Sequence, residues 1–209
     1  MLTKKQLLAA PAVLGLLVTV SPLMAGTDDD GSFTFNMVVS GGAKACLPNA
    51  TASVRITPAG PVETMDVTVQ GLPPNTDFDF FVIQVPKSPF GVSWYQGDIQ
   101  TDKNGRGHGH FIGRFSIETF AVAPGSAPAP AVFSGPFPNA TLNPPFLPIQ
   151  MYHLGLWFNS PVDAQAAGCP GTVTPFNGVH NAGIQVLNTS NFADDHGPLR
   201  SVDPSAPKP

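Results

Sequence analysis

The chain has 209 residues, a net charge of −4 and 11% charged residues, against about 25% in an average soluble domain. Its 10 Lys and Arg are scattered, which argues against binding nucleic acid through phosphate charges. The 24 Pro and 21 Gly exclude a long-helix or coiled-coil protein, because proline interrupts helices. The 42% hydrophobic content, with 15 Phe, can still fill a core.

Residues 1–25 have the layout of a secretory signal peptide. Lys4 and Lys5 precede an apolar stretch at 7–20, and a polar run follows Ala25. The apolar stretch is short for a membrane span. We therefore expect cleavage after Ala25 and a mature chain, without a membrane span, that is secreted or held at the cell surface.

Two cysteines, Cys46 and Cys169, remain in the expected mature chain. In an oxidising compartment, such a pair predicts a disulfide. The alternative is two buried free thiols.

Apolar residues alternate with polar ones along much of the chain, a pattern that predicts β-strands. The run at 78–85 is apolar on both faces, so we expect a strand in the interior of a sheet. Asn104-Gly105 predicts a tight hairpin between arms at 95–102 and 107–120, and Asn177-Gly178 predicts a second hairpin. The predicted strands span residues 33–39, 53–57, 64–69, 78–85, 95–101, 111–118, 151–158 and 183–188.

One short helix is predicted after Ser160, which can cap it, with Pro161 at the first position and Gly168 at the end.

A proline-dense stretch at 122–150 cannot lie in a central strand. We expect it to be an extended excursion across the outside of the sheets, tethered by burial of Phe133, Phe137 and Phe146; the alternative is a linker between two half-domains. Residues 203–209 are rich in proline, and we expect them to form a disordered tail.

Two stretches carry a resemblance to known domains. Residues 69–82, VQGLPPNTDFDFFV, resemble the G-L-x-P-N-T-x-Y corner of immunoglobulin-like and fibronectin-III-like sandwiches, with Phe78 at the usual Tyr position. Residues 97–107, GDIQTDKNGRG, resemble a T-D-x-N-G-x-G hairpin of secreted bacterial sandwich domains. The resemblance implies an Ig-like antiparallel β-sandwich, which agrees with the all-β fold that the alternation predicts, and it implies no activity. We expect residues 26–202 to form a single domain.

His108 and His110 form a His-x-His pair. On a strand both rings point to one side, so they could bind Cu or Zn with a third ligand from His153, His180 or His196. The alternative is a solvated strand face without a metal.

Four aromatic residues suggest a binding platform. Phe90, Trp94 and Tyr95 follow a proline-rich loop, and with Trp157 they could stack on a sugar or another polymer. The alternative is that these rings cap the end of the core.

No catalytic motif emerges from the sequence. Gly-x-Ser-x-Gly, His-Glu-x-x-His, a phosphate loop and a dinucleotide fingerprint are all missing from it. Spacing gives no reason to pair the carboxylates of Asp66, Asp77, Asp79, Asp98 and Glu118. We therefore expect an exported, non-catalytic module with a binding or structural role, whose partner is a cell-surface polymer, a polysaccharide or a protein. The alternatives are a secreted Cu/Zn-dependent or hydrolytic enzyme and a carbohydrate-binding module.

Overall fold

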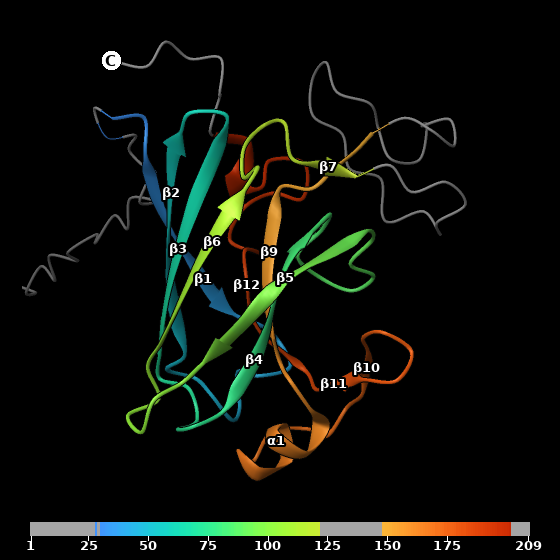
Figure 1. Ribbon diagram of the computed structural model, residues 1–209. Coiled ribbons are helices and arrows are strands. Elements are labelled where there is room, and N and C mark those ends of the chain that lie inside the picture. Colours follow the sequence, from blue (N-terminus) through green and yellow to red (C-terminus); the bar gives the residue numbers. More distant parts are fainter. Residues whose placement is uncertain (1–27, 29, 122–147, 202–209) are drawn as a thin grey trace, which may run out of the picture.

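The computed structural model describes residues 28, 30–121 and 148–201, and the predicted all-β class is confirmed (Figure 1). The eight main strands are β1 (Phe33–Val39), β2 (Thr51–Ala59), β3 (Val62–Gln70), β4 (Asp77–Ile83), β5 (Ser93–Gln100), β6 (Gly107–Gly113), β9 (His153–Phe158) and β12 (Gln185–Asn188). The minor elements are β7 (Phe120–Ala121), β8 (Ile149–Gln150), β10 (Thr174–Pro175), β11 (Asn181–Ala182), the helix α1 (Pro161–Ala166) and a 3₁₀ turn (Pro198–Ser201).

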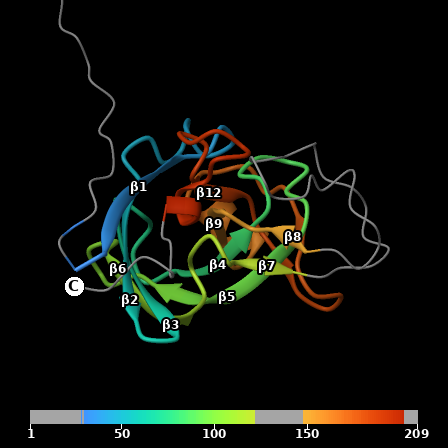
Figure 2. The same cartoon turned by 90° about the horizontal axis from the view of Figure 1, so that it is seen from above.

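The main strands form one antiparallel sheet in the order β5-β4-β9-β12-β1-β2-β3-β6, which folds over on itself. Figure 2 shows β1, β2, β3 and β6 on one side of the core and β12, β9, β4 and β5 on the other. We call these the β1 layer and the β4 layer. Pairing of β1 with β12 joins them on one side, and the turn from β5 to β6, with its Thr101–Gly107 bridge, joins them on the other.

Alternation of side chains places the core between the layers. In β2 and β3, the inward residues Val54, Ile56, Met65 and Val67 are fully buried. The β4 strand lies between β5 and β9, as its two apolar faces predicted. Its inward residue Phe80 stacks on Phe111, with ring centroids 5.4 Å apart.

The predicted hairpin at Asn104-Gly105 is present and docks against the corner between β3 and β4. Gly105 has a φ of +69° and donates its N–H to the carbonyl of Asp102 (3.0 Å). The Leu72 N–H in turn donates to the Gly105 carbonyl (3.3 Å), and a Cβ at Gly105 would overlap the Leu72 carbonyl oxygen. Gly105 is therefore required both by its conformation and by this close approach.

The substitution Gly105→Ala should lower the free energy of unfolding by about 3 kcal/mol, because a left-handed backbone costs an L-residue about 1–2 kcal/mol and the overlap adds to it. Gly168→Ala is the matched control: Gly168 has a φ of +75°, but nothing lies within 4 Å of its Cβ position. The control should lose only about 1 kcal/mol. Urea denaturation at pH 7 measures both variants, and equal losses would contradict the role of the Leu72 contact.

The short helix and the second hairpin are also confirmed. The Ser160 hydroxyl accepts the Asp163 N–H (3.1 Å) as an N-cap, and Pro161 opens α1. Asn177-Gly178 lies in the turn between β10 and β11.

Some predicted boundaries shift. The second hairpin arm, expected at 107–120, begins at Gly107 but ends early: β6 covers Gly107–Gly113, because the chain turns away where the buried Glu63 carboxylate accepts the Phe115 N–H (2.8 Å). The last two predicted strands begin two residues later, at His153 and Gln185. Of the proline-dense stretch at 122–150, only residues 148–150 are described; their strand β8 pairs with β7, which lies just before the stretch. The expected course of residues 122–147 lies outside the described residues. The predicted signal peptide, the anchors Phe133, Phe137 and Phe146, and the tail at 203–209 lie outside the described residues.

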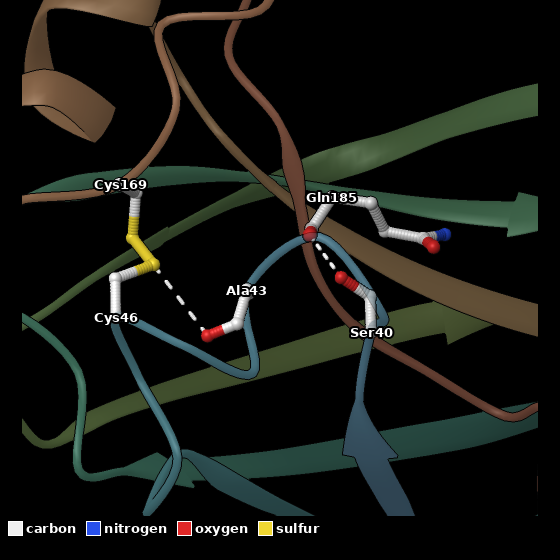
Figure 3. The surroundings of a disulfide bond; sticks show 5 residues. All are labelled: Ser40, Ala43, Cys46, Cys169 and Gln185. Atoms are coloured by element: carbon white, nitrogen blue, oxygen red, sulfur yellow. Dashed lines mark hydrogen bonds between the residues drawn. A yellow bond between two sulfur atoms is a disulfide. The ribbon is translucent and has the colours of Figure 1, made fainter.

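The disulfide between Cys46 and Cys169 is confirmed, and it joins cysteines 123 residues apart (Figure 3). It connects the loop after β1 to the segment that follows α1. Nearby in the same loop, the Ser40 hydroxyl donates to the Gln185 carbonyl of β12. This side of the fold is thus held by strand pairing, a hydrogen bond and a covalent link. None of the helices in the described part of the chain is long and apolar enough to cross a membrane.

Candidate functional site

His108 and His110 lie on β6 and contact one carboxylate. Asp66 on β3 is the direct cross-strand partner of His110. Its Oδ1 lies 2.7 Å from His110 Nδ1 and 3.5 Å from His108 Nε2. Both histidines are at least half exposed, so this cluster is a solvated patch on the outer face of the β1 layer.

The structure does not bring the other histidines to this pair. His153 is fully buried, and burial lowers its pKa to about 4, so the ring is neutral at pH 7. It bridges the Thr189 hydroxyl (Nδ1, 2.9 Å) and the Asp194 carbonyl (Nε2, 3.2 Å). His180 lies beside Asp79, and His196 beside Asp195. Within residues 28, 30–121 and 148–201, no group of three or more His, Cys, Asp or Glu side chains is arranged to hold a metal. Cu or Zn binding at His108 and His110 stays a prediction.

The four aromatic residues of the predicted platform lie on two faces of the β4 layer. Trp94 pairs with Val82 and shares its core-side face, whereas Tyr95 pairs with Phe81 on the outer face. Trp157, also on the outer face, is only 4% exposed and contacts Phe81 (5.2 Å between ring centroids) and Phe90 (5.0 Å). The outer rings therefore pack on one another, and Trp94 is separate from them.

Trp94 lies instead at a cleft of about 590 Å³ between β5 and β6. β5 and β6 are close together at their hairpin, where Thr101 and Gly107 form a bridge, but they are not paired along their lengths. The two strands diverge away from the hairpin, and the cleft lies between them there. Three large apolar residues of the lining are exposed: Trp94 by 63%, Ile112 by 64% and Phe120 by 55%. Met151 is a buried part of the same lining. A cleft with this much exposed apolar surface is the default candidate for a binding site.

A fixed ion-pair network borders the cleft. Arg114 donates to the Pro61 carbonyl (2.8 Å), lies 3.4 Å from the buried Glu63 carboxylate and pairs with Glu118. Two carboxylates thus neutralise the guanidinium, so the polar edge of the cleft is held in place and carries no excess positive charge.

Sequence reasoning missed Ile112 and Phe120 as site residues. Ile112 could have been noticed in the sequence. It is apolar, but it follows the inward Phe111 in an alternating strand, at a position where a polar residue is expected.

A second unusual cluster lies on the outer face of the β4 layer. Asp79 is 1% exposed, and its Oδ2 has no hydrogen-bond partner. Burial is the main cause that raises its pKa to about 6, and its direct cross-strand partner Asp98 contributes. The Tyr95 hydroxyl donates to Asp98 (2.6 Å). The structure therefore pairs two carboxylates whose spacing in the sequence gave no reason to pair them.

Comparison with known proteins adds no relative. No family model matches the chain, and no curated protein is similar to it in sequence. The class that the fold and the site define is an all-β, sandwich-like protein with an apolar cleft at its open edge.

Proposed function

We propose that this protein is an exported, non-catalytic binding module that holds a carbohydrate polymer in the cleft between β5 and β6. The observation that carries the proposal is the 63% exposed Trp94 ring at the cleft, beside the exposed Ile112 and Phe120. The signal-peptide layout of residues 1–25 and the disulfide support export, because disulfides persist in oxidising compartments.

The chemistry of the cleft suits a sugar. A sugar ring has an apolar face and a rim of hydroxyl groups, so it can stack on an indole ring and donate to or accept from nearby polar groups. Gln96, Thr119 and the Arg114–Glu118 pair supply such groups in the lining. Since Arg114 is already neutralised, the cleft favours a neutral polymer over an anionic one.

The hydrolytic alternative has weaker support. A glycosidase needs two carboxyl groups that reach the substrate from either side of a bond. Asp79 is 1% exposed, and it lies away from the cleft on the outer face of the β4 layer.

The test is retention of the purified protein on cellulose, chitin and insoluble β-glucan. The wild type should be retained by at least one of these polymers, and Trp94→Ala should bind that polymer at least about tenfold more weakly through lost stacking. Tyr95→Ala is the matched control, since this neighbouring exposed aromatic residue faces the other side. Lack of retention on all three polymers, or equal weakening by the two substitutions, would refute the proposal.

A further inference from the structure

Residues 170–182, which we call the flap, cross the outer face of the β4 layer. Both ends are anchored: Cys169 is in the disulfide, and the Gly183 N–H donates to the Phe158 carbonyl (2.7 Å). Figure 1 shows the flap, with β10 and β11, beside α1 at one end of the strands. Its tip is open to solvent, with Val179 98% exposed.

Between these anchors, two rings hold the flap to the sheet. The Phe176 ring packs edge-on against Phe81 (5.5 Å) and Tyr95 (5.0 Å). His180 donates from Nε2 to the Asn159 carbonyl (2.8 Å) and packs against Phe176 (4.8 Å). Most other residues of the flap are exposed. A segment with such sparse contacts opens at a lower free-energy cost than the core strands.

The flap lies beside the Asp79 carboxylate, whose negative charge has little compensation from neighbouring groups. The Oδ2 atom of Asp79 has no hydrogen bond, and the nearest basic group is His180 Nε2 at 3.9 Å. The other titratable groups facing Asp79 are Asp77 on its own strand and Asp98 and Tyr95 on β5. Acidic groups therefore outnumber the single histidine around a side chain that the closed flap keeps from water.

We propose that the flap is a pH-dependent cover, closed over β4 and β9 in acid and opening more often near neutral pH, where it exposes the aromatic face formed by Phe81 and Trp157. Closing buries Asp79, and opening returns it to water, so closing is coupled to proton uptake by this side chain.

The direction follows from the two states of Asp79. With the flap closed, burial is the main cause that raises the pKa of Asp79 to about 6; His180 lowers it, and Asp98 and Asp77 raise it further. In water the pKa is 3.8. The extra stability of the closed state is complete below pH 3.8 and is lost as the pH rises through 6. Full hydration of Asp79 on opening makes the open fraction about tenfold larger at pH 8 than at pH 5.

Hydrogen exchange of the flap amides, corrected for intrinsic exchange rates, tests the proposal at pH 5 and pH 8. Wild-type protection should fall about tenfold at pH 8, and Asp79→Asn should show equal protection at both values. Asp98→Asn is the matched control. Because it removes only the neighbouring charge, protection in this variant should still fall between pH 5 and pH 8, but by less than in the wild type. Equal wild-type protection at the two pH values, or an unchanged tenfold fall in Asp79→Asn, would overturn the proposal.

A second measurement does not depend on the folding of an Asp79 variant. In Trp94→Phe the chain has one tryptophan, Trp157, which is 4% exposed beneath the flap. Acrylamide should quench its fluorescence more strongly at pH 8 than at pH 5. The same quenching at both pH values would count against an opening flap.

Discussion

Loss of the Cys46–Cys169 disulfide should lower the free energy of unfolding by about 5 kcal/mol. In the chain-entropy model, the cost of closing a loop in the unfolded chain grows with the logarithm of its length, and this loop spans 123 residues. The link also holds the loop after β1 beside the segment after α1, where the flap begins. The loss is therefore comparable to the whole stability of a marginal domain.

Guanidinium denaturation of the double variant Cys46→Ala/Cys169→Ala, compared with the oxidised wild type, measures this loss. Reduced wild-type protein is the matched control, because it lacks the link but keeps both side-chain volumes. Both should have midpoints far below that of the oxidised protein. A change below about 1 kcal/mol in both would show that the unfolded chain gains little freedom when the link is cut.

The stability of the wild type should change little between pH 6.5 and pH 4, and Asp79→Asn should convert this flat profile into a loss of about 3 kcal/mol on acidification. Two buried groups oppose each other here. The pKa of His153 falls from 6.5 to about 4 on burial, so its contribution is complete above pH 6.5 and is lost as the pH falls toward 4. The pKa of Asp79 rises from 3.8 to about 6, so its contribution grows as the pH falls through the same range.

Urea titrations at pH 7, 5.5 and 4 separate the two groups. Asp79→Asn leaves the acid-sensitive His153, and its stability should fall steadily with pH. His153→Gln removes that sensitivity, so this variant should become more stable toward pH 4. Hydrogen bonds lower the pKa values of the surface carboxylates Asp30, Asp102 and Asp195, and this effect is common to both variants, so the comparison between them cancels it. Parallel pH profiles for the two variants would contradict the opposed roles of His153 and Asp79.

Local patterns in the sequence predicted the local structure well. The Ser160 cap, the two Asn-Gly turns and the alternation in β2 and β3 each involve residues within a few positions of one another. The disulfide was also predictable, because the expected exported chain contains only two cysteines.

The candidate sites depend on pairings between distant residues, which no local pattern contains. Asp79 meets Asp98 because β4 and β5 are paired in a particular register, and it approaches His180 (3.9 Å) only because the flap, from much later in the chain, folds back beside β4. The cleft exists because β5 and β6 diverge beyond their hairpin. The division of the aromatic residues could have been anticipated, since Trp94 and Tyr95 are consecutive in a strand and so point to opposite faces.

The position of β12 has a consequence for how the molecule is made. This strand lies between β9 and β1, so the first strand acquires its second neighbour only when residues 185–188 arrive. During synthesis, β1, β2, β3 and β6 can assemble early, but the β12 edge of β1 stays unpaired until residues 185–188 have been made. Closure of the sheet between β1 and β9 is thus a late step in the folding of this chain.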